Sequence, residues 1–195
     1  NERFGIPKMI SMKYTIGLLF SLLLAFSASG QSTSNYVALG LEFQQYPTGS
    51  IPGIRLGVSV AEHHSLDFRV GYNIVYHGDA GVRQLEEGGG FGISPGYQYW
   101  FRSEHEGLFL GARVDFWFNT IDWKDNIGLP NEVNGVTEIT VVQPTIMGGY
   151  SIPIGQKLYL TPTLAVGAEI NTQQEGEDVG EGAVLLAGIQ FNYRI

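Results

Sequence analysis

Apolar and polar residues alternate with a period of two along most of the chain beyond residue 35. The final stretch, GIQFNYRI, is the clearest example, because Ile189, Phe191, Tyr193 and Ile195 alternate with polar residues. This period is typical of a β-strand with one apolar face. A strand with a free edge presents unpaired N–H and C=O groups to any neighbour, so we expect another strand to cover it.

Seven earlier segments show the same alternation, whereas no segment beyond residue 31 has a convincing helical period. The seven lie at residues 36–46, 54–60, 66–74, 92–101, 108–119, 137–150 and 157–170. The apolar phase of the sixth segment is ambiguous, and we favour Val142, Pro144, Ile146 and Tyr150 as its apolar face. Together with the C-terminal strand, the pattern predicts an all-β fold. The fold class that we expect is an eight-stranded antiparallel up-and-down transmembrane β-barrel, closed by pairing of the last strand with residues 36–45, for the reasons given below.

The connections between these segments alternate between long and short. Those after the first, third, fifth and seventh segments are long, and the others, such as AEHHS and RSEHEG, are shorter. In an even-numbered meander, this alternation places the long loops at one end and the short turns with both chain termini at the other. That asymmetry is typical of an outer-membrane barrel.

Alternation alone leaves two orientations of the barrel wall open. A soluble barrel of the lipocalin kind turns its apolar residues inward around an apolar ligand, whereas a transmembrane barrel turns them outward to lipid. A water-facing surface should be rich in lysine, yet Lys124 and Lys157 are the only lysines after residue 31. The polar phase combines glycines with charges of both signs at Glu42, Asp67, Asp115, Glu169, Arg55, Arg69 and Arg113. These features favour a filled interior of paired charges and an apolar surface that faces lipid.

Aromatic residues fall near both ends of the predicted strands, as two interfacial girdles require. Those at the short-turn end are Tyr36, Tyr99, Phe101, Tyr150, Tyr159, Phe191 and Tyr193, of which Tyr36 and Tyr159 are in the inward phase. Those at the long-loop end are Tyr46, Tyr72, Tyr76, Phe91 and Phe118. Three prolines, Pro95, Pro144 and Pro162, lie in the outward phase, where we expect bulges or local breaks because each removes a ladder hydrogen bond.

The first thirty residues differ from the rest of the chain. Lys13 precedes the apolar run TIGLLFSLLLAF and the small residues of SASG, a pattern typical of a secretory signal peptide. We therefore expect an upstream extension and cleaved signal peptide at residues 1–30 and a barrel domain at residues 31–195. Without residues 1–30 the formal charge falls from −8 to −10, which argues against nucleic-acid binding. The absence of cysteine excludes disulfides and thiolate chemistry.

The predicted strands, the signal peptide and the ending GIQFNYRI together resemble the small outer-membrane β-barrel proteins of Gram-negative bacteria, which include the barrel domain of outer-membrane protein A. The resemblance covers residues 36–195. Gly188, Phe191 and Tyr193 look like the C-terminal signal recognised by the barrel-assembly machinery, although this chain ends on Ile195 rather than phenylalanine. The resemblance implies a location in the cell outer membrane, among outer-membrane lipids and lipopolysaccharide.

Candidate metal and catalytic residues are few. Two short turns hold Glu62, His63, His64, Glu104, His105 and Glu106, which would suit zinc or copper, although hydrated polar turns explain them more simply. A lipid-modifying enzyme would need a nucleophile and a base near the outer rim. No motif-like spacing joins His77, a loop or girdle residue by its position, to the candidate serines Ser50, Ser59, Ser65 and Ser94.

The predicted outer loops are acidic. One holds Glu175, Glu177, Asp178 and Glu181, another holds Asp122, Asp125 and Glu132, and a third holds Asp79, Glu86 and Glu87. Solubility explains such loops, and divalent cations could also bridge them to lipopolysaccharide.

We therefore expect an integral outer-membrane barrel with a structural or surface-interaction role through long acidic extracellular loops. An eight-stranded barrel is just wide enough for side chains to fill, so we expect no open diffusion pore. We predict no enzymatic activity, catalytic residue, cofactor or metal. The expected partners are outer-membrane lipids and lipopolysaccharide, the assembly machinery and an extracellular ligand at the loops. The alternatives are a lipid-modifying enzyme and a secreted soluble lipocalin-like carrier of an apolar ligand.

Overall fold

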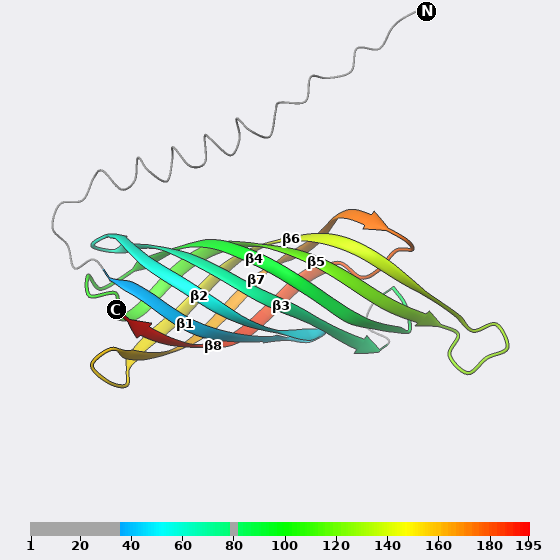
Figure 1. Cartoon of the computed structure of the whole chain (residues 1–195), viewed down its shortest axis with the longest axis horizontal. Coiled ribbons are helices and arrows are strands. Elements are labelled where there is room, and N and C mark those ends of the chain that lie inside the picture. The colour runs from blue at the N-terminus through cyan, green and yellow to red at the C-terminus, as the bar shows by residue number, and fades with distance from the viewer. Residues whose placement is uncertain (1–35, 79–81) are drawn as a thin grey trace, which may run out of the picture. The chain divides into compact units, whose positions relative to one another are not determined.

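The computed structural model describes residues 36–78 and 82–195, which form one closed barrel of eight antiparallel strands in chain order (Figure 1). The strands are β1 (Val37–Tyr46), β2 (Gly49–Ala61), β3 (His64–Gly78), β4 (Leu85–Trp100), β5 (Gly107–Asp125), β6 (Val133–Pro153), β7 (Leu158–Glu175) and β8 (Gly182–Arg194). The predicted fold class is confirmed. The predicted signal peptide at residues 1–30 lies outside the described residues. Within the described part of the chain, no helix is long and apolar enough to cross a membrane.

The last strand closes the barrel against the first one. β8 pairs with β1 from Ala38↔Arg194 to Gln45↔Ala187, and the Ile195 N–H donates to the Val37 carbonyl at 2.9 Å. The predicted pairing with residues 36–45 is thus confirmed. Because the other edge of β8 pairs with β7, the C-terminal strand has no free edge.

The apolar phase of the strands faces outward, and the polar phase faces the lumen. Leu41 and Phe91 are 62% and 69% exposed, whereas Glu42 and Arg69 are buried. The favoured phase of β6 is correct, because Pro144, Ile146 and Tyr150 are exposed. This arrangement excludes the soluble lipocalin-like alternative, which requires the apolar phase inside around a ligand.

Most of the predicted girdle aromatics lie on the outer surface, including Tyr72, Phe91, Tyr99 and Phe191. Tyr46 is an exception, because its side chain points into the lumen and its hydroxyl donates to Asn73 Oδ1 at 2.6 Å. Placing Tyr46 in a girdle was therefore wrong. The inward phase expected for Tyr159 is confirmed by its burial.

The connections do not alternate strictly between long and short. Residues 47–48 alone join β1 to β2, whereas residues 101–106 join β4 to β5 at the opposite end. The two ends of the barrel differ because β5 and β6 are long, with 19 and 21 residues. Their hairpin projects beyond the other strands (Figure 1). We call this end of the barrel the loop end, and we call the end that holds the C-terminus the terminal end.

The prolines interrupt the strand ladders without changing their register. Pairing of β4 with β5 stops at Ile93↔Phe116 and resumes at Gly96↔Arg113, on either side of Pro95. Pairing of β6 with β7 is likewise interrupted around Pro144 and around Pro162. The register shifts that do occur lie elsewhere, between Ser59 and Ala61 and between Thr140 and Val141. The expected local breaks are therefore present at the prolines, and bulges are not.

Gly92 makes room for the largest fully buried side chain among the described residues. Trp117 is fully buried, and a Cβ atom at Gly92 would lie 2.1 Å from Trp117 Cε3 and 2.4 Å from the Phe116 carbonyl oxygen. In a close-packed interior, neither the Trp117 ring nor the Phe116 backbone can move away from an added Cβ atom without disturbing its neighbours.

Gly92→Ala should therefore lower the free energy of unfolding by about 1–3 kcal/mol, the usual cost of overpacking. Gly57→Ala is the matched control, because the nearest atom to its added Cβ would be Ala38 Cβ at 3.9 Å. Urea unfolding in phospholipid vesicles, followed by tryptophan fluorescence, measures both variants. Equal midpoints for the two variants would contradict this account of Gly92.

Candidate functional site

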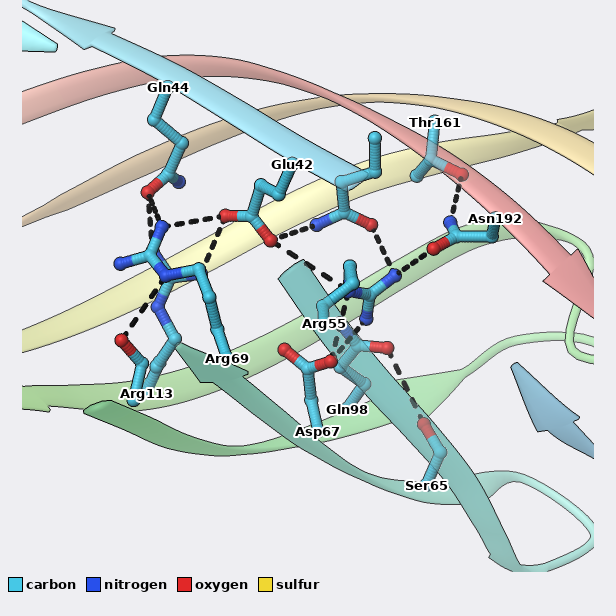
Figure 2. Close-up of polar contacts among 12 residues, drawn as sticks. Glu42, Gln44, Arg55, Ser65, Asp67, Arg69, Gln98, Arg113, Thr161 and Asn192 are labelled. Atoms are coloured by element: carbon cyan, nitrogen blue, oxygen red, sulfur yellow. Dashed lines mark hydrogen bonds and ion pairs between the residues drawn. The ribbon is translucent and has the colours of Figure 1, made fainter. Parts of the chain in front are cut away.

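The middle of the lumen is filled by a buried charge network centred on Glu42 of β1 (Figure 2). Its Oε1 accepts from Arg69 Nη1 at 3.0 Å and from Arg113 Nη1 at 2.8 Å, while Gln190 Nε2 donates to its Oε2 at 3.1 Å. The three charged side chains have no exposed surface. One carboxylate thus joins β1, β3, β5 and β8 across the lumen.

Two further carboxylates complete the charge balance of the network. Arg55 donates through Nε to Asp67 Oδ1 at 3.0 Å, and Arg69 donates through Nη2 to Asp115 Oδ1 at 2.8 Å. The network therefore contains three guanidinium groups and three carboxylates. Pairing of this kind is what makes buried charge tolerable, since an unpaired buried ion costs several kcal/mol.

Small residues on neighbouring strands leave space for the long arginine side chains. Gly40 is opposite Arg55 in the β1–β2 ladder, and Gly96 is opposite Arg113 in the β4–β5 ladder. The sequence-based prediction that glycines of the polar phase make room for paired charges is confirmed at these positions. Six of the seven predicted interior charges belong to the network, and the seventh, Glu169, does not.

Trp117 covers the charge network on the side of the loop end. Its ring lies 5.2 Å from the Arg69 guanidinium, and its Nε1 donates to Gln143 Oε1 at 3.0 Å. Sequence reasoning missed Trp117, although its place in the inward phase between Asp115 and Asn119 was a usable signal. The indole adds an apolar layer to the closure of the lumen.

Beyond this layer, the loop end holds a cavity of about 710 Å³. Its wall includes Glu169 of β7, which faces Gly182 in the register and so lies near the loop end rather than at the level of Glu42. His77 and Glu86 also line the cavity, and His77 Nε2 lies 3.1 Å from Glu86 Oε2. Glu86 is therefore a buried residue of β4 rather than a loop residue, and His77 belongs to β3.

The histidines of the terminal end pack against aromatic rings and backbone groups at the rim. Among residues 36–78 and 82–195, no group of three or more His, Cys, Asp or Glu side chains could hold a metal ion. His105 is buried against Tyr36 and Trp100, and burial lowers the pKa of its imidazole. His63 Nδ1 lies 2.8 Å from the Trp100 carbonyl oxygen, and His64 Nδ1 contacts the Tyr97 hydroxyl. These rings pack the rim of the barrel.

The candidate serines take part in hydrogen bonds within the barrel wall. Ser65 Oγ accepts from Trp100 Nε1 at 2.9 Å, Ser94 Oγ accepts from Arg69 Nε at 3.2 Å, and Ser59 Oγ accepts from the Tyr36 N–H at 3.2 Å. Ser50 lies on β2 opposite Ile74. The contacts of Ser65 and Ser94 are structural and differ from a nucleophile beside a histidine base.

Arg83, which sequence reasoning missed, ties the acidic loops together. It donates to Asp125 Oδ2 at 2.8 Å and to Glu177 Oε2 at 3.3 Å, and its guanidinium lies 4.3 Å from the Trp123 ring. The hydrogen bond from Arg83 lowers the pKa of the Asp125 carboxyl. Two of the predicted acidic loop residues are therefore paired, whereas Asp79 lies outside the described residues.

The closed ladder, the apolar outer surface and the filled polar interior define the class of protein, which is an outer-membrane β-barrel. The chain belongs to the family described as "Protein of unknown function (DUF3575)", whose model matches residues 18–177. The predicted resemblance to small outer-membrane barrels and the predicted location in the cell outer membrane agree with this class.

Three solved structures match most of this chain. Neisserial surface protein A (NspA) is 11% identical to this chain, with a TM-score of 0.53 and coverage of 85% of this chain and 100% of that one. The N-terminal β-barrel domain of Pseudomonas aeruginosa OprF is 14% identical, with a TM-score of 0.46 and coverage of 84% and 100%. The translocator domain of the autotransporter NalP from Neisseria meningitidis is 10% identical, with a TM-score of 0.46 and coverage of 94% and 96%. A comparison with the curated proteins gives no match.

Removing one cation from the charge network should destabilise the barrel strongly. Arg113→Met leaves Glu42 and Asp115 each with one fewer partner, so we expect the free energy of unfolding to fall by about 3–5 kcal/mol. Arg102→Met is the control, because Arg102 is exposed in the β4–β5 connection. Both are measured by urea unfolding in vesicles, and an unchanged midpoint for Arg113→Met would refute the structural role of the network.

Proposed function

We propose that the protein is an integral outer-membrane barrel whose lumen is not an open diffusion pore and whose loop end has a structural or surface-interaction role. The observation that carries the proposal is the charge network around Glu42, which fills the lumen with buried side chains. Trp117 supports the same conclusion, because its side chain has no exposed surface and its ring lies against the Arg69 guanidinium of the network.

The acidic loop end supplies the surface for interaction. Asp122, Glu132, Asp178 and Glu181 are exposed, and the projecting β5–β6 connection also exposes Ile127 and Leu129. Carboxylates beside lipopolysaccharide attract divalent cations that bridge to its phosphates, and they also suit a cationic extracellular ligand. The proposed partners are therefore outer-membrane lipids and lipopolysaccharide, together with an extracellular ligand at the loops.

Biogenesis adds the barrel-assembly machinery as a proposed partner. The C-terminal strand carries Phe191 and Tyr193 on its outer face, where both side chains are exposed on the assembled barrel. A recognition signal on this strand would be read before β8 pairs with β1, since that pairing occupies its backbone groups.

We further propose that the protein is not an enzyme. The hydroxyls of Ser65 and Ser94 are engaged by Trp100 and Arg69, and His77 pairs with Glu86. These contacts leave the lipid-modifying alternative without a nucleophile and base in the arrangement that acyl transfer needs.

The closed lumen is tested by liposome swelling. Vesicles that contain the purified protein should swell in an isotonic arabinose solution no faster than empty vesicles, because the network leaves no path for a sugar. Heat-modifiable gel mobility confirms that the reconstituted protein is folded. Swelling at the rate given by a general porin would overturn the closed lumen.

Exposure of the loop end on cells is tested by labelling single cysteines, which is straightforward because the chain has none. Leu129→Cys in the β5–β6 connection should react with a membrane-impermeant maleimide on intact cells. Gln156→Cys, in the β6–β7 turn at the terminal end, should react only after the outer membrane is permeabilised. The reverse pattern would show that the barrel has the opposite orientation.

A further inference from the structure

The cavity at the loop end differs from the rest of the lumen because its charge is not balanced. Among the described residues that line it are four carboxylates, Glu86, Glu169, Asp178 and Glu181, and no lysine or arginine. His77 offsets Glu86 when it is protonated, since the two side chains are paired. The cavity is therefore acidic, and its volume of about 710 Å³ is that of a small-molecule site.

Glu169 is the carboxylate without a partner. No side chain or backbone group in the part of the chain that the structure describes donates a hydrogen bond to it or forms an ion pair with it. The other carboxylates do have partners: Glu181 accepts from the Asn171 N–H at 2.9 Å, and Asp178 accepts from Gln174 Nε2 at 3.0 Å. Glu169 is half-buried, and a carboxylate partly removed from water without a counter-charge favours the binding of a cation.

A second, independent feature of the cavity wall also points to a ligand. Asn119 of β5 is only 4% exposed and lines the cavity, yet its Oδ1 has no hydrogen-bond partner among the described residues. The Oδ1 of Asn171, which also lines the cavity, is likewise unpartnered. Buried amide oxygens are normally hydrogen-bonded. The two amide oxygens therefore lack a donor, which a ligand that carries N–H groups would supply.

The chemistry of the wall distinguishes an organic cation from a metal ion. Ile121, Ile139 and Val141 are buried and form an apolar side of the cavity. Apolar side chains are poor surroundings for a hydrated divalent cation, and the described residues provide no group of three or more metal-ligating side chains. An alkyl or aryl body would pack against them and leave its charged end for Glu169.

We propose that this cavity binds a small organic ammonium compound, with Glu169 as its counter-ion, Asn119 as a hydrogen-bond partner and Ile121, Ile139 and Val141 around its apolar body. The ligand enters from the rim, where Asp178 and Glu181 are exposed and attract cations. This site goes beyond the proposed role of the loop surface. It does not depend on the orientation of the barrel in the cell, because it can be measured on the purified protein.

The test uses phenethylamine, which is a protonated primary amine at neutral pH, as the probe for the full folded protein in a neutral detergent. Isothermal titration calorimetry should give one binding site. The neutral analogue 2-phenylethanol, which keeps the apolar body and loses the charge, should bind at least about tenfold more weakly. This comparison needs no variant, so it remains informative even if a substitution impairs folding.

Glu169→Gln preserves the size of the side chain and removes its charge, so it should weaken phenethylamine binding at least about tenfold. Glu175→Gln is the matched control, because Glu175 lies on the same strand, is exposed and does not line this cavity. It should leave the affinity within about twofold of the unchanged protein.

Three results would overturn the proposal. The first is no binding of phenethylamine by protein whose heat-modifiable mobility shows that it is folded. The second is binding that does not depend on charge, seen either as equal affinity for phenethylamine and 2-phenylethanol or as equal phenethylamine affinity in Glu169→Gln and the unchanged protein. The third is calcium binding that displaces phenethylamine and depends on Glu169, which would make the cavity a metal site.

Discussion

Every backbone N–H and C=O group that faces lipid must find its hydrogen-bond partner within the protein, because the bilayer core offers none. Pairing of β8 with β1 meets this requirement where the chain would otherwise leave two open edges. The inward direction of the polar face follows from closure, since the alternate side chains of each strand must then face the acyl chains. The prolines are local exceptions to this complete pairing. The ladders break around Pro95 and Pro144, and the register continues beyond them.

Closure also leaves an interior that side chains must fill. In this barrel the interior is filled by charged side chains whose charges cancel. Glu42 interacts with Arg69 and Arg113, while Asp67 and Asp115 balance the remaining positive charge. A purely apolar filling would contain no group to discourage insertion of the strands in the wrong register. A charge network gains its energy only when all partners meet, and each unpaired member is penalised.

The two ends of the barrel are built differently. At the terminal end, Arg194 lies 3.8 Å from the Tyr159 ring and 4.6 Å from the Tyr36 ring, and His105 is buried against Trp100. The loop end instead keeps a cavity, around which Arg83 connects the β3–β4, β5–β6 and β7–β8 regions. The terminal end is thus packed with aromatic rings, whereas the loop end is hollow and acidic.

The sequence by itself determined the strands, the inward and outward faces and the seam. The strands and their two faces depend on the period of two, which is a property of neighbouring residues and needs no knowledge of the partner strand. The outward direction of the apolar face follows instead from residue types, namely the scarcity of lysine and the paired charges of the polar phase. The sequence also identified the six charged residues of the network as inward-facing residues, because buried charges of opposite sign have to pair. The tertiary structure alone decided which charges meet.

That decision depends on register between strands far apart in the chain, as in the contact of Glu42 with Gln190, 148 positions away. The same register separated Glu169 from the network and extended β5 and β6 through residues that resemble a loop. Arg83 could not be found from the sequence, because the three regions that it connects come together only when the barrel closes. Periodicity fixes the direction in which a side chain points, whereas the stagger of the closed sheet fixes its height and therefore its neighbours.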